Sequence, residues 1–505
     1  MSMCSCFYLD EINYTVMDNW VVFLCVSAVL LSTAVHGVMQ AFRRRKLPPG
    51  PIGLPIFGNL FQIMGKPHES MAALAKSHGP LMTLQLGFVT AVVASSPETA
   101  KEILQKHGQA FAGRTVPDAV TAGRDYELSS AWVPPDARWR SRRKIFNTQI
   151  FTAARLDALE PLLNRKMIDM TEYVGELSLT GQAVDVGHLA FSTMLNAISN
   201  LVFSVDVVDY KSESGGEFRD MMARIMEDSG KPNMADFFPF LKRFDLQGIR
   251  RHIKVAYDYH QLIIDDLIDR RLQSRLPRKN DFLDVLLDQS EEEQNFDRRS
   301  VKILISDLFI AGGDTTANTV EWVMAELMRN PRIMRKAQEE VRSRPGIKQS
   351  EIAGLRYLQA VVKETMRLHP IAPLLLPHRA ETDAELCGYC VPRNTQVFIN
   401  AWAIARDESR WRDPASFSPE RMLEEEVDYL GTDFGFIPFG SGRRMCPGWP
   451  LAVRMVPLML ASLLRSFDWD LPVEASPETI DMADKFGVTL RKAVPLLAVP
   501  VKRLF

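Results

Sequence analysis

The sequence predicts one large, mainly α-helical domain with a small β-rich part, preceded by an N-terminal transmembrane helix. Three observations predict this fold class. An uncharged apolar run occupies residues 20–42, helical spacing of apolar residues dominates after residue 59, and strand-like patterns are confined to a few short segments. No internal repeat and no Gly/Ser-rich linker divides the body, so residues 60–505 are expected to fold as one domain.

The composition is that of an ordinary globular protein. Of the 505 residues, 46% are hydrophobic and 24% are charged, and the net charge of −2 gives no reason to expect nucleic acid as a partner. The six cysteines are few and unevenly placed, which favours a reducing compartment over a disulfide framework. Cys387 and Cys390 form a CxxC pair, but no second ligand pair accompanies it, so two thiols near a turn are expected there rather than a zinc or redox site.

Residues 1–46 are predicted to form a membrane anchor that ends in a basic stop-transfer sequence. The run Trp20–Phe42 contains no Asp, Glu, Lys or Arg and is long enough to span a bilayer as a helix. The basic cluster Arg43–Lys46 follows it, which places the rest of the chain in the cytosol by the positive-inside rule. A cleaved signal peptide is the alternative, but its basic residues would precede the apolar run. The sequon at Asn13 lies close to the membrane, which favours an unmodified asparagine.

Residues 47–59 are predicted to be a Pro-rich hinge. The segment 48–55 contains four prolines, which preclude a helix and favour a stiff, extended chain. Such a segment would hold the catalytic body at a set orientation to the anchor.

The body is expected to contain long helices and a few short strands. The expected strands are Leu81–Leu86, Val89–Ala94 and Thr395–Ile399. The expected helical regions are Phe151–Phe203 and Phe218–Leu276, both interrupted by Gly and Pro, and residues 300–330, which contain no proline before Pro331.

Cys446 lies in the pattern F-x-x-G-x-R-x-C-x-G, which runs from Phe439 to Gly448 and precedes the helix-forming run Leu451–Phe467. This order delivers one cysteine to a helix N-terminus, where unpaired backbone N–H groups and the macrodipole stabilise an anion. Arg444 is a fixed cation suited to a carboxylate. A lone cysteine would suggest a structural thiol in a Gly-rich turn, but the combined spacing favours a thiolate ligand to haem iron.

The motif Ala311–Thr316, with sequence AGGDTT, interrupts the helix expected at 300–330 with two glycines and two threonines. Glycine and threonine have low helix propensity. Such residues inside an otherwise regular helical pattern often mark a functional site. Glycines allow a flat cofactor to approach, a Thr hydroxyl can hydrogen-bond a bound oxygen species, and Asp314 can relay protons. Thr side chains bonded back to the backbone of a kinked core helix are the alternative.

Two further charged motifs stand on helices. Glu364 and Arg367 are three residues apart and can pair on one face, and Arg421 can join them in a structural ion-pair network that holds the loop carrying Cys446. Trp139 and Arg143 are four apart, which suits two donors to an anionic cofactor edge.

The helix of Trp139 carries further cations, at Arg138, Arg140, Arg142 and Lys144. They could attract an acidic electron donor. A solvated basic helix face is the alternative.

At these motifs the sequence resembles the cytochrome P450 superfamily. The anchor, the Pro-rich hinge, WxxxR, AGxDTT, ExxR, the Pro-Glu-Arg segment and the Cys loop occur in the family's order over essentially the whole chain. The resemblance implies the cytochrome P450 fold, with β-rich parts near residues 60–100 and 375–400. It also implies haem b as cofactor, O₂ as co-substrate and electrons from NADPH through NADPH–cytochrome P450 reductase.

The resemblance assigns roles to matching positions. Cys446 matches the proximal iron ligand, and Asp314 with Thr315 matches the acid–alcohol pair for proton delivery. Cofactor contacts are implied for Arg114, Trp139, Arg143, His378, Arg444, Phe439, Gly440 and Ala311. Glu364, Arg367 and Arg421 match the structural triad. Met422 departs from the family's usual aromatic residue, and Trp449 and Pro450 begin the helix after the cysteine.

Within the superfamily the chain resembles plant microsomal enzymes, and more narrowly the group that contains geraniol and diterpene hydroxylases. The stretches that carry this narrower likeness are Arg114–Ala119, Gly230–Asn233, Asp236–Pro239 and Asp245–Arg250. It implies a single-pass protein of the endoplasmic reticulum membrane with a cytosolic catalytic domain. The implied substrate pocket comprises the segment 116–127 with Phe309, Ala311, Gly312, Ile371, Leu375, Phe486 and Val488, which outside the first segment is mostly apolar.

The expected function is therefore hydroxylation of a small hydrophobic plant metabolite, with a mono- or diterpene favoured. A phenolic, alkaloid-related or foreign compound is the alternative substrate. A reductase-independent haem-thiolate isomerase or dehydratase is a different reaction class, which the oxygen-activating pair Asp314–Thr315 disfavours. A non-enzymatic haem sensor would not need the surrounding motifs.

Overall fold

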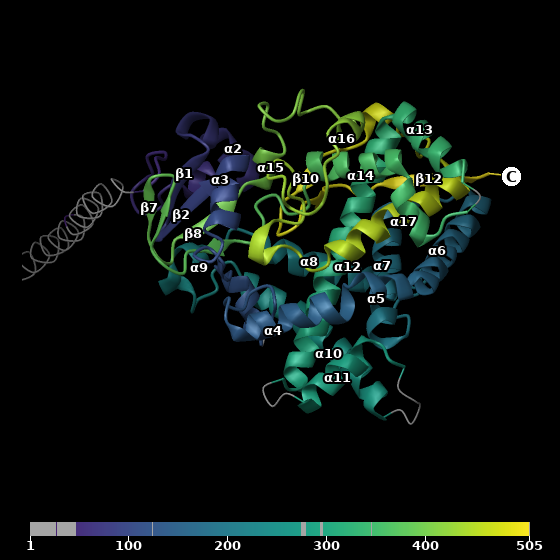
Figure 1. Ribbon diagram of the computed structural model, residues 1–505, viewed down its shortest axis with the longest axis horizontal. Coiled ribbons are helices and arrows are strands. Elements are labelled where there is room, and N and C mark those ends of the chain that lie inside the picture. The colour runs from purple at the N-terminus through teal and green to yellow at the C-terminus, as the bar shows by residue number, and fades with distance from the viewer. Residues whose placement is uncertain are drawn as a thin grey trace, which may run out of the picture.

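The computed structural model describes Ser27 and residues 47–503, except 124, 274–278, 293–295 and 345. The predicted anchor, apart from Ser27, thus lies outside the described residues. Within the described part, one helix, Val186–Phe203, is long and apolar enough to cross a membrane, but 83% of its apolar window is buried inside the protein. Figure 1 shows a β-rich part at the left and a larger helical part at the right.

The β-rich part is a five-stranded sheet whose strands come from both ends of the body. Its order is β1-β2-β8-β5-β3, and β2 and β8 are parallel neighbours. The strands are β1 (Leu81–Leu86), β2 (Val89–Ala94), β3 (Gly113–Arg114), β5 (His378–Arg379) and β8 (Gln396–Ile399). The first two have the bounds expected from the sequence, because alternating buried residues and the two-residue turn at Gly87–Phe88 define a hairpin.

The Pro-rich segment packs along the free edge of β1. The backbone carbonyl of Pro49 accepts a hydrogen bond from Thr83 N–H at 2.8 Å, and Asn59 exchanges bonds with the Gln85 backbone at 2.6 and 2.7 Å. A Cβ at Gly50 or Gly58 would lie about 2 Å from the Thr83 or Gln85 carbonyl oxygen, so only glycine fits. The segment is joined to the sheet rather than standing free of it. Only its first part is extended as expected, because Leu54 and Gly58 exchange two backbone hydrogen bonds of 2.8 Å and close a tight turn in which Ile56 has φ 65°.

Long helices build the rest of the molecule (Figure 1). The helices before the centre are α2 (Pro67–His78), α3 (Pro97–Lys101), α4 (Ala137–Ile145), α5 (Ala153–Ala158), α6 (Glu160–Thr180), α7 (Val186–Phe203), α8 (Glu213–Gly230), α9 (Met234–Phe237) and α10 (Ile249–Gln273). The later ones are α11 (Phe282–Glu292), α12 (Arg298–Arg329), α13 (Pro331–Arg342), α14 (Arg356–Leu368), α15 (Ala401–Ile404), α16 (Glu420–Glu424) and α17 (Trp449–Ser466). Short helical turns complete them: η1 (Leu60–Gln62), η2 (Glu102–Lys106), η3 (Asp118–Ala122), η4 (Tyr126–Leu128), η5 (Phe146–Ile150), η6 (Pro239–Leu241), η7 (Gln349–Gly354), η8 (Gly442–Arg444) and η9 (Pro477–Thr479).

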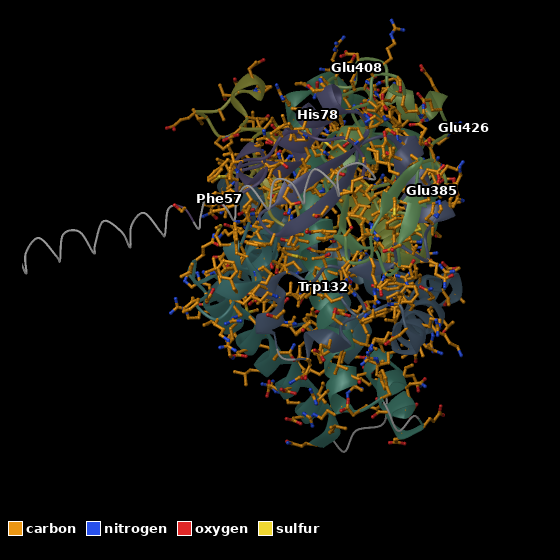
Figure 2. All side chains as sticks on the ribbon, turned by 90° about the vertical axis from the view of Figure 1, so that its left-hand side faces the viewer. Phe57, His78, Trp132, Glu385, Glu408 and Glu426 are labelled. Carbon is orange, nitrogen blue, oxygen red and sulfur yellow. The ribbon has the colours of Figure 1, made fainter. Side chains whose placement is uncertain are left out.

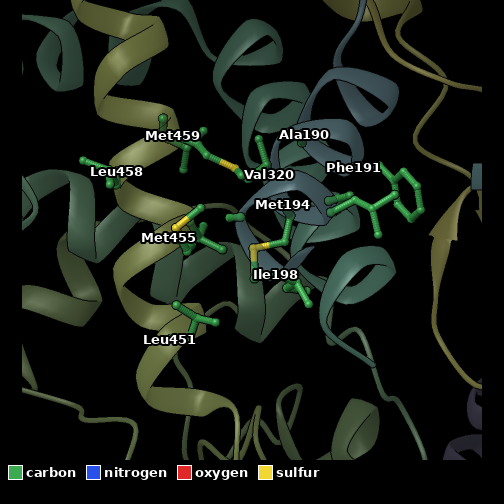
Figure 3. Packing of buried hydrophobic residues seen from close by; sticks show 14 of the residues in the cluster. Ala190, Phe191, Met194, Ile198, Val320, Leu451, Met455, Leu458 and Met459 are labelled. Atoms are coloured by element: carbon green, nitrogen blue, oxygen red, sulfur yellow. The ribbon is translucent and has the colours of Figure 1, made fainter. Parts of the chain in front are cut away.

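Helix α12 lies at the centre of the helical part, with α7 and α17 against it (Figure 3). Met194 and Ile198 of α7, Val320 of α12 and Met455 of α17 belong to one buried cluster. Gly313 faces the ring of Phe191, where an added Cβ would come within 3.1 Å. The glycines of the AGGDTT motif thus allow α12 and α7 to approach closely, a packing role that the sequence did not reveal.

Glycines and prolines end the helices where the sequence predicted interruptions. Gly181, with φ 66°, terminates α6, and Pro331 follows the end of α12. Further small sheets near the C-terminus were not anticipated. They are formed by β4 (Val184–Asp185), β9 (Phe467–Asp470) and β12 (Leu497–Lys502), and by β10 (Asp484–Lys485) with β11 (Arg491–Lys492).

The CxxC pair lies on a hairpin of β6 (Ala384–Leu386) and β7 (Tyr389–Val391). Cys387 occupies the turn with φ 51°, and both thiols are exposed and unpaired. This is the turn arrangement that the sequence favoured over a zinc or redox site.

Candidate active site around Cys446

A cavity of about 800 Å³ lies between the Cys446 loop and helix α12. Cys446, Phe439 and Gly440 line one wall, and Ala311, Gly312 and Thr315 line the other. The two motifs that the sequence singled out for chemistry therefore face one another across a single space.

The Cys446 loop is fixed by its backbone. Cys446 N–H donates to the carbonyl of Phe439 at 2.9 Å, and Ser441 Oγ donates to the carbonyl of Gly431 at 2.6 Å. Gly442 has φ 67°, and a Cβ there would lie 2.1 Å from the backbone oxygen of Leu104. Only glycine can therefore occupy this position without moving the loop.

The thiol of Cys446 sits at the N-terminus of α17. Burial raises its pKa, while N–H groups of Gly448 and Trp449 and the charge of Arg143 lower it. The buried thiolate of Cys446 therefore has hydrogen-bond donors beside it, but it lacks a full positive counter-charge. A bound iron cation would supply that charge and hold the thiolate form.

Three buried or half-buried guanidinium groups gather at the edge of the cavity, from Arg114, Arg143 and Arg444. Burial and the neighbouring arginines lower the pKa of Arg114 to about 9, and burial with Arg143 lowers that of Arg444 to about 10. Among the described residues none of the three forms a salt bridge; they donate to the backbone carbonyls of Leu376, Met445, Ala112, Ser130 and Val133.

Cations that repel one another inside a protein indicate that an anionic ligand belongs beside them. The Arg114 Nε has no hydrogen-bond partner among the described atoms, and Trp139 and His378 line the same edge. Arg444 stacks over the Trp139 ring at 4.7 Å. A planar cofactor with two carboxylates and a metal would fit these groups, since the cations would hold the carboxylates and the Cys446 sulfur would hold the metal; this is the donor set that haem requires.

Thr315 and Asp314 are adjacent in sequence but differ in surroundings. Thr315 lines the cavity, and its Oγ1 donates to the Ala311 carbonyl at 2.6 Å. Asp314 is buried and does not line the cavity; burial raises its pKa. Its carboxylate accepts from Thr489 Oγ1 at 2.8 Å and Asn318 Nδ2 at 3.0 Å.

Thr489 is a site residue that the sequence analysis missed. It lines the cavity and bonds Asp314, so it connects the buried acid with the open space. Its 175-residue separation from Asp314 gave no local pattern. The signal available was its position next to the pocket candidate Val488.

The Glu364–Arg367 pair is fully buried and held by two bonds of 2.8 and 2.9 Å. Arg421 Nε donates to the same carboxylate at 2.9 Å. Arg367 also donates to the carbonyls of Ala405 and Pro414 at 2.7 and 2.8 Å. The triad thus fixes the segment around 405–418 directly, and that segment precedes the Cys446 loop in the chain.

The pocket candidates fall into two groups. Gly312, Ile371, Leu375 and Val488 line the cavity, as do Val120, Gly123, Asp125 and Tyr126 of the segment 116–127. Phe309 and Phe486 are not lining residues. Phe309 is fully buried beside Phe203 and His260, at ring distances of 6.1 and 6.3 Å. Phe486 stacks on His68 of α2 with ring centroids 5.4 Å apart, so its ring packs against that helix and not against the cavity.

Comparison with known proteins agrees with this geometry. The family profile described as Cytochrome P450 matches residues 48–496. The geraniol 8-hydroxylase of Swertia mussotii is 47% identical over 479 residues, covering 93% of this chain and 97% of the relative. The geranylhydroquinone 3''-hydroxylase of Arnebia euchroma is 44% identical over 469 residues, covering 91% and 95%. The 7-ethoxycoumarin O-deethylase of Helianthus tuberosus is 44% identical over 483 residues, covering 95% and 99%.

Proposed function

The chain belongs to the cytochrome P450 family and is a monooxygenase, and from this premise we propose that it hydroxylates an acyclic terpenoid held above Cys446. The observation that carries the proposal is the cavity itself, in which the cysteine loop faces the Ala311–Thr315 segment of α12. When bound, haem b supplies activation of O₂ and oxidation of a C–H bond.

The residues around the cavity have separable tasks. Cys446 would hold the iron, and Arg114, Arg143, Arg444, Trp139 and His378 would hold the carboxylate edge of the cofactor. Thr315 presents a hydroxyl to the cavity, and Asp314 is a buried acid that can exchange protons through Thr489. Apolar lining residues exclude water and orient the substrate, which fixes the carbon that is oxidised.

The terpenoid assignment rests on two supports. The lining near Thr315 is apolar, with Ile198, Ile371, Leu375 and Val488. Two of the relatives carry names that describe hydroxylation of prenyl compounds. The deethylase from Helianthus tuberosus represents the competing possibility, an aromatic ether substrate.

We place the protein at the endoplasmic reticulum membrane, anchored by residues 1–46. The described part adds exposed apolar residues in and next to the Pro-rich segment, among them Phe57, which is labelled in Figure 2. Ile52 is 85% exposed and Phe244 is 67% exposed. The ring pairs Phe57–Phe61, Phe57–Phe238 and Phe88–Phe240, at 5.2 to 5.9 Å, join the segments into one patch. A patch of this kind suits contact with a lipid surface.

For the electron donor we propose NADPH–cytochrome P450 reductase, docking against α4. Arg138, Arg140 and Lys144 are exposed on this helix and offer positive charge to an acidic partner. Arg142, which the sequence placed in the same group, is 4% exposed and cannot take part in that surface.

Expression in microsomes with a plant reductase tests the proposed function. Supplied with NADPH and a panel of monoterpenols, diterpene olefins and 7-ethoxycoumarin, the protein should convert a terpenoid to a hydroxylated product. Conversion of 7-ethoxycoumarin alone would replace the terpenoid assignment.

The Cys446→Ala variant tests the role of the cysteine. It should lose the thiolate-type spectrum of the reduced CO complex and all oxygenase activity, because no other described thiol lines the cavity. A variant that retains either property would refute the ligand assignment.

A further inference from the structure

One end of the cavity is polar, in contrast to its apolar middle. Helix α12 contributes Ser306 and Asp307 to this end, α10 contributes Tyr257 and Gln261, and the loop before α4 contributes Ser129. Asp307 accepts hydrogen bonds from Ser129 Oγ and Ser130 N–H, both at 2.7 Å. Tyr257 and Gln261 are four residues apart, so they face the cavity from one side of α10.

The polar end offers acceptors that lack a donor. Gln261 Nε2 donates to Ser306 Oγ at 2.9 Å, which orients the amide and leaves Gln261 Oε1 buried with no partner among the described atoms. The Asp307 carboxylate accepts hydrogen bonds from Ser129 and Ser130, and its two oxygens can accommodate a further donor. A buried acceptor without a donor costs free energy, so a ligand that donates here is stabilised.

The charges farther along this end are already paired. Lys302 bonds Asp265 at 2.8 Å, and Arg299 pairs with Asp125. Lys302 and Arg299 are therefore not available to a carboxylate, and the acceptors Gln261 and Asp307 would repel one. A positively charged head group is disfavoured in turn, because Arg142 is buried near Asp307 and burial raises the pKa of that carboxyl. A neutral donor, a hydroxyl group, fits best.

The distance along helix α12 between the polar end and Thr315 indicates the length of substrate that fits. Asp307 and Thr315 are eight residues apart, which corresponds to about 12 Å at the rise of an α-helix. Between them Ile310 and Ala311 line an apolar stretch of the cavity. An acyclic monoterpene alcohol in extended form has a comparable length, so its hydroxyl and its distal carbon can occupy the two ends together.

We propose that Gln261 and Asp307 form a subsite for the hydroxyl head group of an acyclic isoprenoid alcohol, with the carbon to be oxidised about 12 Å away beside Thr315. This inference rests on the proposed function. It adds that the substrate carries a hydroxyl group, and it names the residues that bind this group. It predicts that the oxidised carbon lies at the end of the molecule opposite the hydroxyl.

Spectral titration of the full-length haem protein in microsomes tests the subsite without turnover. The probes are geraniol and its O-methyl ether, which share a carbon skeleton and differ in the donor. The wild-type protein should bind geraniol about tenfold more tightly than the ether. Gln261→Met and Asp307→Leu remove the acceptor oxygens, so they should weaken geraniol binding and leave ether binding nearly unchanged, and the preference should disappear.

Two further variants make the result specific. Gln261→Glu keeps an acceptor and should retain most of the preference. Gln359→Met makes the same substitution as Gln261→Met on α14, outside this cavity, where Gln359 donates to the Ile352 carbonyl at 3.3 Å; it should bind both probes like wild type.

The outcomes separate the inference from the function on which it rests. Equal binding of geraniol and the ether by the wild type, with both hydroxylated, overturns the subsite while the terpenoid hydroxylase assignment stands. A preference that persists in both Gln261→Met and Asp307→Leu also overturns it. If no terpenoid perturbs the spectrum or is oxidised although the CO complex forms, the proposed function fails and this inference fails with it.

Discussion

Asp314 and Thr489 form a buried hydrogen bond that ties the acid of α12 to the C-terminal loop. The AGGDTT motif revealed the acid and the alcohol Thr315, because both are neighbours in sequence. Local pattern could not reveal Thr489, since a threonine in an extended loop has no periodicity that indicates a partner. Gln261 and Asp307 also escaped notice, because they line one end of the cavity together only when α10 packs beside α12.

Thr489→Val should impair the reaction without unfolding the protein. The valine has a similar shape but removes one of the two side-chain donors to Asp314, so the pKa of Asp314 should rise further and proton supply should suffer. We expect about tenfold less product per NADPH consumed, since a hydrogen bond to a charged group contributes about 1.5–3 kcal/mol.

Thr489→Ser is the matched control, because it keeps the hydroxyl and should restore most of the coupling. Normal coupling in Thr489→Val, measured as the ratio of product to NADPH, would show that Thr489 only fills space.

Asp236 is predicted to make stability depend on pH. It bonds the backbone N–H of Asp118 at 2.6 Å, and burial raises its pKa to about 6. The folded protein therefore favours the protonated acid, and the stability that the neutral form provides is lost as pH rises from about 4 through 6. Asp236→Asn keeps the acceptor but cannot ionise, so it should stabilise the protein by about 2–3 kcal/mol at pH 7.5 and by little at pH 4.

Thermal unfolding across that pH range measures the difference between Asp236→Asn and wild type. Asp266→Asn, at an exposed position on α10, serves as control and should shift stability by less than about 0.5 kcal/mol at either pH. A difference for Asp236→Asn that stays constant with pH would contradict the prediction.

At the scale of elements, the sequence predicted those whose pattern is local. The β1–β2 hairpin and the long helix α12 matched expectation because alternation, helical spacing and Pro331 act over neighbouring residues. The small C-terminal sheets were missed. Their strands have two to six residues each and pair segments such as β4 and β12, which are hundreds of residues apart.

Two glycines of the Cys446 loop should respond differently to alanine. Both have positive φ, 70° at Gly440 and 67° at Gly442. A Cβ at Gly440 would meet only Leu375 at 3.7 Å, so Gly440→Ala should cost about 1–2 kcal/mol of backbone strain. At Gly442 the Cβ would strike the backbone of Leu104 in η2 at 2.1 Å, and Gly442→Ala must displace the loop.

The measurement is haem content per chain together with the thermal midpoint. Gly440→Ala should retain haem with a lowered midpoint, whereas Gly442→Ala should lose most of its haem. Similar values for both variants would mean that the loop tolerates displacement against η2.

At the scale of the whole molecule, the apolar surface next to the Pro-rich segment should bind membranes on its own. A chain that starts at residue 47 should still sediment with phospholipid vesicles. Replacing Phe240, Phe244 and Leu246 by serine should release it, because each large apolar side chain contributes about 1.5–3 kcal/mol when buried.

A matched triple variant controls for the loss of exposed apolar residues in general. Leu179, Val473 and Val494 are also exposed but lie elsewhere. Leu179 is near the end of α6, Val473 follows β9 and Val494 follows β11. Their replacement by serine should leave vesicle binding intact. Vesicle binding that vanishes with the removal of residues 1–46 would show that the apolar surface contributes nothing.

The Pro-rich segment affects how the β1 edge of one copy of the protein can pair with another copy. An open sheet ends in a row of unpaired N–H and C=O groups that a strand of another molecule can join. Here Pro49 and Asn59 occupy the bonding positions of Thr83 and Gln85, so this row is already filled. Proteins confined to a membrane surface reach high local concentrations with similar orientations. The same residues that lead from the proposed anchor to the body would thus keep neighbouring copies from joining edge to edge into aggregates.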